Sequence, residues 1–439
     1  MAKQISLGLD IGTTTISAVV ADMEMKTVLA SCTRNHNADL PSENPREKIQ
    51  SAQIIEAIAR GILNQLLEQY PQVCAIGITG QMHGILYLNA GGEPVSPLYT
   101  WQDQQGTEIC TELTQRTGYG LASGYGLVTH CALAKTGSVP EQSWKLCTVM
   151  DYLAFSLCGK KRLLMHITNA ASLGFFCLRE ENFDREALEK VGIDASIVPE
   201  VTSEAEILGF YQGIPVLVAI GDNQASFLGS VPEPETMALA NFGTGSQISR
   251  MVRSLDGLQT ERGIEIRPFL KGSYLLCGSA LCGGKAYALL ERFFRSFAVR
   301  CGLPEESCYE ILNTMAAEGI TRTDLPRVTT TFCGTREDPL LRGSIESISQ
   351  DNFTPQAFTA GLLLGMAQEL YDLFSRMPHT GVTGLVASGN AVRENPVLVR
   401  ALEQVFAAPV AACECREEAA FGAACFAASG ERENIYCKQ

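Results

Sequence analysis

Three features that would assign a chain to a particular class of protein are missing from this sequence. It has no apolar run long enough to cross a bilayer, which predicts that no helix spans a membrane. Basic residues are scarce: 34 lysines and arginines face 48 acidic residues, and the net charge of −14 disfavours nucleic acid or an anionic membrane as a partner. No positively charged N-terminal segment precedes an apolar run, so we expect no secretory signal and a cytoplasmic location.

Paired cysteine motifs are also missing, although the chain has 16 cysteines. A chain of 439 residues can bury a large apolar core without disulfide bonds, and its length suggests two or three domains. Cys413 and Cys415 are the one close pair. Because no histidine or further cysteine lies near them in the sequence, the spacing favours alternate positions of a strand over a metal site.

The N-terminal segment has the clearest structural pattern. Apolar residues of Ile5–Leu9 alternate with small or polar ones, which predicts a half-buried strand that ends at Asp10 and returns as a second strand after a turn. Gly12 lets the backbone bend, and the hydroxyl and N–H groups of Thr13 and Thr14 could surround phosphate oxygens. The carboxylate of Asp10 could hold Mg²⁺ through water. An ordinary hairpin is the alternative interpretation.

A similar string recurs in the second half of the chain. Asp10 aligns with Asn241, and the Gly-Thr pair of the turn aligns with Gly243 and Thr244. Repetition on this scale indicates two similar domains, each with a hairpin that faces the same nucleotide. A proline-containing segment at 230–235 marks the crossing between them. We therefore expect an N-terminal domain at residues 1–230 and a C-terminal domain at residues 231–439.

Two further strands are predicted to end in polar segments. Residues 73–79 form a short apolar run before the glycine-flanked loop 80–84, and open α/β sheets bind ligands where their strands end. The near-continuous apolar run 214–221 predicts a buried parallel strand, with Asp222 at its carboxyl end. A purely structural histidine and a helix N-cap are the alternatives for His83 and Asp222.

Other segments of the first half suggest a sugar site and its scaffold. Trp101 is one of only two tryptophans, and with Asp103 it could offer an apolar face and a hydroxyl acceptor to a sugar. The alternative is an aromatic residue on the rim of the fold. Residues 166–172, which include Asn169, indicate a polar loop, and helical spacing predicts a helix at 47–70.

The second half contains a comparable set of signals. A strand at 384–388 precedes a loop with Gly389 and Asn390, where the glycine would let an adenine ring lie flat on the backbone. Asn395 before a proline predicts an N-cap and a first helical residue. Small residues at 419–428 predict a helix that is suited to close packing and too short to cross a membrane.

Taken in order, these strings resemble the FGGY carbohydrate kinases, a branch of the actin-like ATPase superfamily. The similarity covers nearly the whole chain and includes both Gly-Thr hairpins and the strings GQMHG, TWQD, TNAAS, GDNQAS, NFGTGSQ and SGNAVRENP. It implies an α/β fold of two actin-like, ribonuclease H-like ATPase domains with an interdomain cleft. Within the family, TWQD, NAAS and GDNQAS most resemble the sedoheptulokinases, with the xylulokinases as the near alternative.

The resemblance implies transfer of the γ-phosphoryl group of ATP, with Mg²⁺, to a hydroxyl of a ketose, such as sedoheptulose to give sedoheptulose 7-phosphate. Asp222 corresponds to the catalytic base, and Asp10 and Asp222 correspond to the acids beside the metal. The residues that match nucleotide contacts are Thr13, Thr14, Gly243, Thr244, Gly283, Gly389, Asn390 and Asn395. The residues on the sugar side are Gln81, Met82, His83, Trp101, Asp103, Asn169 and Asp222.

The string GTRED at 334–338 replaces a more usual GER-type string, which weakens a role for Arg336. Two other classes of function stay open: a non-catalytic protein that responds to sugar or nucleotide on the same scaffold, and an actin-like filament or chaperone ATPase. Retention of Asp222 with both hairpins favours an enzyme. GQMHG and TWQD favour a sugar pocket, which a filament protein does not need. A homodimer is compatible with the sequence.

Overall fold

The computed structural model describes residues 4–258, 261–335, 338 and 340–436, so Arg336 lies outside the described residues. These residues form two large mixed sheets with helices packed on them, and five two-stranded sheets, which confirms the predicted α/β fold class. The chain divides into two compact units. The first unit comprises Met1–Gly229, Pro268–Gly272 and Glu417–Gln439, and the second comprises Ser230–Arg267 and Ser273–Arg416.

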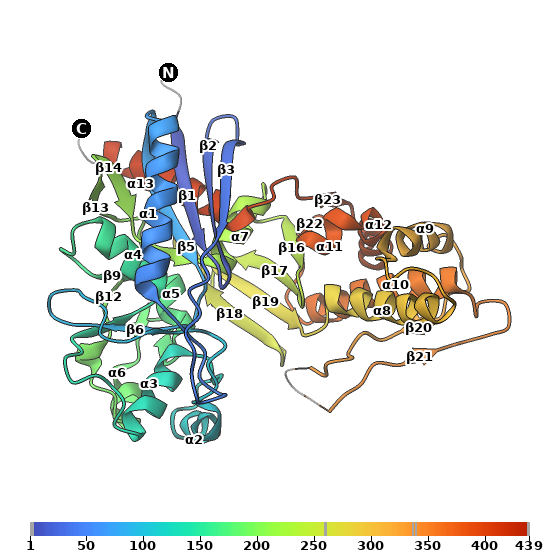
Figure 1. The fold of residues 1–439 in the computed structure, drawn as a ribbon, viewed down its shortest axis with the longest axis horizontal. Coiled ribbons are helices and arrows are strands. Elements are labelled where there is room, and N and C mark those ends of the chain that lie inside the picture. Colours follow the sequence, from blue (N-terminus) through green and yellow to red (C-terminus); the bar gives the residue numbers. More distant parts are fainter. Residues whose placement is uncertain (1–3, 259–260, 336–337, 339, 437–439) are drawn as a thin grey trace. The chain divides into compact units, whose positions relative to one another are not determined.

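The first unit is built on a sheet with the strand order β13-β14-β5-β1-β2-β3 (Figure 1). In this order the strands are Ile207–Tyr211, Ile214–Leu217, Val73–Gly80, Ile5–Ile11, Thr15–Asp22 and Thr27–Asn35. β1, β2 and β3 form an antiparallel meander, and β5 and β14 continue in parallel on the other side of β1. A two-residue strand, β15 (Ile220–Gly221), also pairs with β5 in parallel.

Helices cover both faces of this sheet. α1 (Ala52–Gln69) shares an apolar core with Leu7 and Leu9, whereas α13 (Glu418–Tyr436) packs on β1 and β5. A Cβ atom on Gly8 would lie 1.8 Å from the carbonyl oxygen of Ala420, so the helix backbone rests directly on the strand. The prediction that β1 is half-buried is therefore wrong, because its glycine-bearing face is covered by a helix.

The second unit contains a sheet with the order β18-β19-β17-β16-β22-β23. The strands are Ile264–Pro268, Tyr274–Ala280, Ser246–Val252, Met237–Phe242, Gly384–Ser388 and Val410–Ala412. β16, β17 and β19 form an antiparallel meander, and β22 and β23 continue in parallel beyond β16. The topology of the first sheet is thus repeated, and Asn241 occupies the place in β16 that Asp10 occupies in β1.

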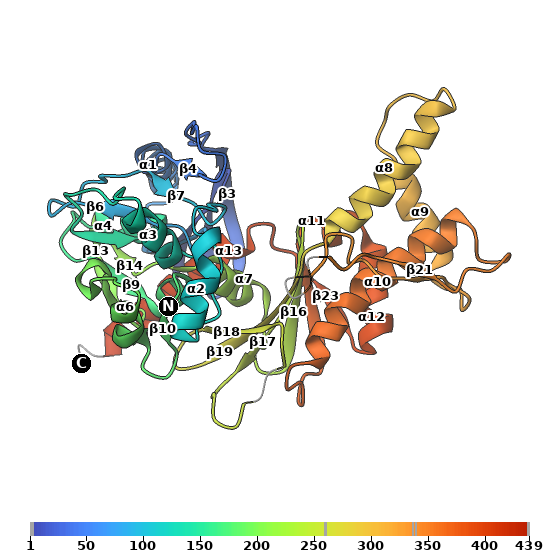
Figure 2. The ribbon, with the colours of Figure 1, turned by 90° about the horizontal axis from the view of Figure 1, so that it is seen from below.

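The helical part of the second unit is organised around α10 (Pro355–Ser375), which packs against α9 (Tyr309–Gly319), α12 (Pro396–Phe406) and the sheet (Figure 2). α12 begins as predicted: the side chain of Asn395 accepts a hydrogen bond from the N–H of Val397 at 3.0 Å. α8 (Gly284–Arg300) begins at the second glycine of its pair, with Gly283 as the N-cap residue.

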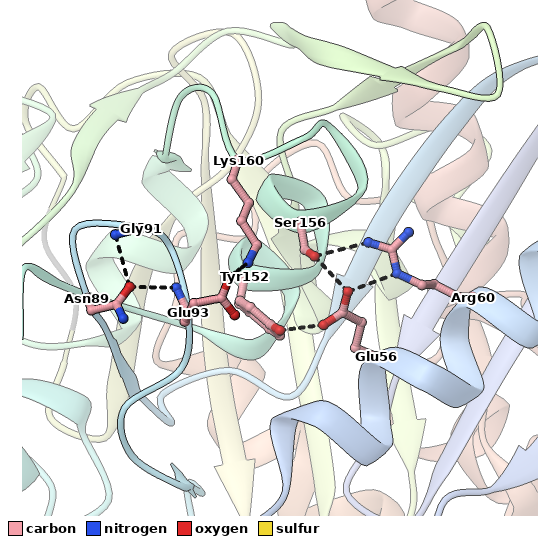
Figure 3. Close-up of polar contacts among 8 residues, drawn as sticks. All are labelled: Glu56, Arg60, Asn89, Gly91, Glu93, Tyr152, Ser156 and Lys160. Carbon is pink, nitrogen blue, oxygen red and sulfur yellow. Dashed lines mark hydrogen bonds and ion pairs between the residues drawn. The ribbon is translucent and has the colours of Figure 1, made fainter.

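A polar cluster fixes α1 to α4 (Val149–Leu157) in the first unit (Figure 3). The Glu56 carboxylate accepts hydrogen bonds from Arg60 at 2.8 Å, from Ser156 at 2.6 Å and from the Tyr152 hydroxyl. Burial opposes the ionisation of Glu56, but these donors outweigh burial and lower its pKa. We assign the cluster a structural role, because it joins two outer helices.

Two local predictions need correction. The helix expected at 47–70 begins later, because Ile49–Gln50 form a short strand, β4, and the Ser51 side chain then caps α1. The loop expected at 166–172 is a buried helix, α5 (Ile167–Ser172). Its polar side chains are buried because they bond to partners outside the helix, Thr168 to the Gly221 N–H and Asn169 to Asp151 and the Ala219 carbonyl.

The apolar run 214–221 forms two strand segments, β14 and β15, with Val218 and Ala219 between them. Both segments are parallel to β5. Among the residues that the structure describes, no helix is both long enough and apolar enough to cross a membrane.

Candidate active site

Three strands of the first sheet end next to one another. Gly80 at the end of β5 lies opposite Ile11 of β1 and opposite Gly221 of β15, and the three strands are parallel. The residues that follow these ends are Gly12–Thr14, Gln81–His83 and Asp222. The sheet therefore brings the predicted phosphate turn, sugar loop and catalytic carboxylate to one edge, where open α/β sheets bind their ligands.

Asp222 is the first residue of α7 (Asp222–Ser230) and is partly exposed. Three fully buried side chains bind the backbone of the residues before it. The bonds are Thr79 Oγ1 to the Ile220 carbonyl (2.8 Å), the Gly221 N–H to Thr168 Oγ1 (3.0 Å) and Asn169 Nδ2 to the Ala219 carbonyl (3.1 Å). The backbone cannot shift without breaking these bonds. They therefore fix the position of the backbone that carries the Asp222 side chain.

The Thr168 hydroxyl is in turn oriented by His166. Nε2 of His166 lies 3.3 Å from the Ser203 carbonyl and so carries the ring proton, which leaves Nδ1 as an acceptor 2.9 Å from the Thr168 hydroxyl. Burial lowers the pKa of His166 to about 4, against the effect of the Ser203 bond, and keeps the ring neutral. Thr168 therefore donates to His166 and keeps a lone pair for the Gly221 N–H.

Asn169 is oriented by Asp151. The Asp151 carboxyl accepts from Asn169 Nδ2 at 2.9 Å and from the Thr148 hydroxyl at 2.6 Å. Both donors of the Asn169 amide are thereby occupied, and its Oδ1 is buried without a partner among the described residues. Burial raises the pKa of Asp151 to about 7, although the two hydrogen bonds act in the other direction.

The raised pKa of Asp151 predicts a pH-dependent stability. Between its ordinary value of 3.8 and about 7, the folded protein binds more protons at this site than the unfolded chain does, so stability falls as pH rises through that window. We expect Asp151→Asn to remove up to about 4 kcal/mol of this dependence while keeping the acceptor for Asn169. Urea denaturation of both proteins between pH 4 and pH 8 checks this. The same pH dependence of the free energy of unfolding in both proteins would contradict this prediction.

Asp10 lies in a concentration of negative charge. Burial, and after it the nearby carboxylates of Asp222, Glu417 and Glu418, raise the pKa of Asp10 to about 8. In the described part of the chain, no three or more His, Cys, Asp or Glu side chains form a ready metal cluster. Mg²⁺ does not require one, because it is usually held by one or two carboxylates, several waters and substrate phosphates. Asp10 and Asp222 fit such a site.

The turn after β1 points its carbonyl groups into the protein. The carbonyl of Gly12 lies 3.2 Å from His36 Nε2, that of Thr13 accepts from Gln50 Nε2 at 2.7 Å, and that of Thr14 accepts from the His36 N–H at 3.1 Å. The N–H groups of Thr13 and Thr14 have no hydrogen-bond partner within the described residues. A turn with occupied carbonyls and unpaired N–H groups is suited to phosphate oxygens.

In the sugar loop, Gln81 and Met82 are buried and His83 is partly exposed. His83 has a φ of 75°, a strained value for a residue with a side chain. Its ring stacks on Tyr125 at 4.8 Å, and its Nδ1 lies 2.7 Å from the Ser172 carbonyl. Strain that is held in place by a stacked ring and a hydrogen bond is typical of a binding site.

Trp101 and Asp103 have different environments. Trp101 is 47% exposed, and its indole N–H donates to Thr13 Oγ1 at 3.0 Å. Asp103 is completely buried, and its carboxylate accepts from the N–H of Lys48 and from two donors of Gln105. Asp103 therefore holds the loop in this structure, while about half of the Trp101 side chain is exposed.

The hairpin of the second unit has the same character as the first. The carbonyl of Gly243 accepts the Gly284 N–H at 2.9 Å, and that of Thr244 accepts the N–H groups of Gly283 and Lys285, both at 3.1 Å. Gly283 must be glycine, because a Cβ atom there would lie 2.2 Å from the Gly245 carbonyl oxygen. The start of α8 thus fixes this turn as Gln50 and His36 fix the first.

The segment after β22 packs against the second hairpin. Gly389 has a φ of 94°, and a Cβ atom there would lie 2.4 Å from the Phe242 carbonyl oxygen, so the backbones meet closely. Asn390 is exposed and accepts from Arg393 at 2.6 Å. Asn395 is buried as the cap of α12. The structure thus brings Gly389 to Phe242, the residue before Gly243, and gives Asn395 a role in forming the segment.

The residues that orient the first site are not among the predicted site residues. They are buried polar side chains that do not themselves face a ligand: His36, Gln50, Thr79, Asp151 and Thr168. No local pattern marks them, because each bonds to a residue that is distant in the sequence. Only the hydrogen bonds of the folded chain reveal their roles.

A model of known sequences, described as the FGGY family of carbohydrate kinases, N-terminal domain, matches residues 5–229. The chain belongs to the FGGY family of carbohydrate kinases. It is an ATP-dependent sugar kinase by membership of this family. The predicted resemblance is therefore confirmed at the level of the family.

Individual FGGY relatives have low sequence identity to this chain. The sedoheptulokinase of Mus musculus is 28% identical, over 96% of this chain and 97% of its own length. The glycerol kinase of Trichlorobacter lovleyi is 26% identical, over 95% and 88% respectively. Among solved structures, the xylulose kinase of Rhodospirillum rubrum has a TM-score of 0.84 at 21% identity, over 98% of this chain and 90% of that chain. The structural likeness concerns the fold alone.

Proposed function

We propose that this FGGY kinase phosphorylates a ketose, with sedoheptulose as its substrate and sedoheptulose 7-phosphate as its product. The similarity to a sedoheptulokinase over nearly the full length of both chains supports this choice. The strings TWQD, NAAS and GDNQAS support it as well. In this proposal the N-terminal domain, residues 1–230, supplies sugar contacts and the base, and residues 231–439 supply nucleotide contacts.

The observation that carries the proposal is the position of Asp222. It follows the end of β15, which pairs with β5, the strand next to β1, and its charge is close enough to Asp10 to raise the pKa of that residue. One carboxylate would hold Mg²⁺, while the other faces the acceptor hydroxyl. Two acids that share one site can thus take different roles.

The chemistry requires little more of the protein. The sugar oxygen bonds to the γ-phosphorus, the bond from phosphorus to the ADP oxygen breaks, and the hydroxyl proton passes to Asp222. In a loose transition state this proton leaves late, so a carboxylate of ordinary basicity can accept it. The N–H groups of Thr13 and Thr14 stabilise charge on the phosphate, and Mg²⁺ would supply further neutralisation at Asp10.

Within the described residues, three buried amide oxygens keep an unused acceptor, and one of them belongs to Gln81 on the predicted sugar side. Oε1 of Gln81, Oδ1 of Asn169 and Oε1 of Gln224 have no hydrogen-bond partner among the described residues. In each amide the nitrogen donates to a fixed acceptor, so the oxygen is the atom left over. Hydroxyl groups are the donors that such oxygens lack, and a sugar carries many.

The test is a panel of sugars with Mg-ATP, followed by release of ADP. We expect sugar-dependent ADP, with the highest kcat/KM for sedoheptulose and lower values for xylulose and glycerol. If xylulose or glycerol is preferred, the substrate assignment is wrong but the kinase assignment holds. The absence of sugar-dependent ADP with every ketose and polyol would defeat the proposal and favour a non-catalytic binding protein.

A further inference from the structure

The side-chain amide of Gln50 is buried and fully hydrogen-bonded. Its Nε2 donates to the Thr13 carbonyl at 2.7 Å and to Asp39 Oδ1 at 2.8 Å, and its Oε1 accepts from Gln81 Nε2 at 3.0 Å. Both partners of the nitrogen are acceptors only, so the orientation of this amide is not ambiguous. Gln50 therefore joins the first residue of the sugar loop to the phosphate turn.

This arrangement also fixes the amide of Gln81. Because Gln50 presents an oxygen, Gln81 must present its nitrogen, and its own Oε1 faces the other way. That oxygen is buried and has no partner among the described residues. An acceptor in this state gains a full hydrogen bond when a ligand hydroxyl reaches it.

Thr13 is held at two atoms. Gln50 occupies its carbonyl, and the indole N–H of Trp101 donates to its hydroxyl oxygen. The hydroxyl hydrogen of Thr13 is therefore directed away from Trp101 and can be donated to a phosphate oxygen. A movement of Gln81 or Trp101 on sugar binding would be transmitted to the orientation of this residue.

We propose that Gln50 is a positioning residue that couples sugar binding at Gln81 to nucleotide binding at the Thr13 turn. The inference rests on the proposed function, because it assigns Gln81 to the sugar side. The Gln50 side chain is almost completely buried, and its amide bonds to protein atoms. It acts through one amide, whose two ends bond to the two loops, so a shift at one loop changes the hydrogen bonding at the other.

The experiment measures binding of the Mg²⁺ complex of AMP-PNP, a non-hydrolysable ATP analogue, by calorimetry, with and without the best sugar of the panel. In the wild-type protein we expect the sugar to change nucleotide affinity by at least about fivefold. Gln50→Met keeps the volume and removes all three hydrogen bonds, and the change should fall to within about twofold of unity. Gln81→Met removes the link from its other end and should give the same loss.

Tyr152→Phe is the matched control. It removes a hydrogen bond to Glu56 on α1, the helix that follows Gln50, and should lower the melting temperature without altering the coupling (Figure 3). In the double variant Gln50→Met/Gln81→Met, the sugar should change nucleotide affinity by no smaller a factor than in either single variant. Both substitutions interrupt the same series of hydrogen bonds. Wild-type coupling in Gln50→Met, or none in the wild-type protein, would overturn the inference. Failure of every sugar to bind would instead overturn the proposed function.

Discussion

Replacement of Asp222 by asparagine is expected to lower turnover by roughly 10²- to 10⁴-fold, the range for loss of a general base. Asparagine keeps the size of the side chain and can still bond to a sugar hydroxyl, but it cannot take up the proton at neutral pH. The backbone before it stays anchored by Thr79, Thr168 and Asn169, so the fold should be unaffected. The kcat for sedoheptulose and the affinity for AMP-PNP together check this.

Asp194→Asn is a suitable control for the same chemical change. Asp194 is exposed in the first unit, where its carboxylate accepts the Ser196 N–H at 2.8 Å, and asparagine can replace it in that role. Turnover of this variant should stay within about twofold of the wild-type value, as expected for a surface change. If Asp222→Asn retains near wild-type turnover, another group is the base.

The features that could be predicted from the sequence are local. A Gly-Thr turn between two strands, a strand followed by an acid, and Asn395 before a proline each depend on residues within one segment, and the structure contains all of them. The placement of Asp222 near the first turn involves two segments that are distant in the sequence. It follows from a general rule that parallel strands carry their ligand sites at their carboxyl ends.

The features that could not be predicted depend on distant partners. Gln50 has no recognisable signal, since its role arises only when β4 brings it to Thr13 and Gln81. Asp151 is an ordinary first-turn acid by sequence, and burial with Asn169 gives it a different chemistry. A hydrogen-bond network is specified by three-dimensional neighbours, whereas sequence patterns report only periodicity along one element.

The same limit explains the error on β1. Alternation of apolar residues with Ser6 and Gly8 predicts a face toward water, although both residues are buried in β1 where α13, about 400 residues later in the chain, packs on it. The small residues at 419–428 predict close packing, but nothing in the sequence identifies their partner. Gly8 of β1 packs against Ala420 and Ala424 of α13.

Gly8→Ala should destabilise the protein by roughly 4 kcal/mol or more, an exceptional effect for one methyl group. The added Cβ would lie 1.8 Å from the Ala420 carbonyl oxygen and 2.6 Å from the Ala424 nitrogen. Both are backbone atoms of α13, so no side-chain rotation relieves the clash and the helix must leave the sheet. Urea denaturation, together with the yield of folded protein, measures the effect.

Gly61→Ala is the matched control in the same unit, with the opposite sign expected. Gly61 lies inside α1, and a Cβ atom there would have an ordinary contact of 3.5 Å with Arg34. Alanine at such a position should stabilise the helix by about 0.5–1 kcal/mol. Gly77→Ala repeats the first test on β5, where the Cβ would lie 1.9 Å from the Ala423 carbonyl oxygen. If the free energy of unfolding of both strand variants lies within about 1 kcal/mol of the wild-type value, α13 does not pack on this sheet in solution. Backbone contacts this close tolerate no added atom.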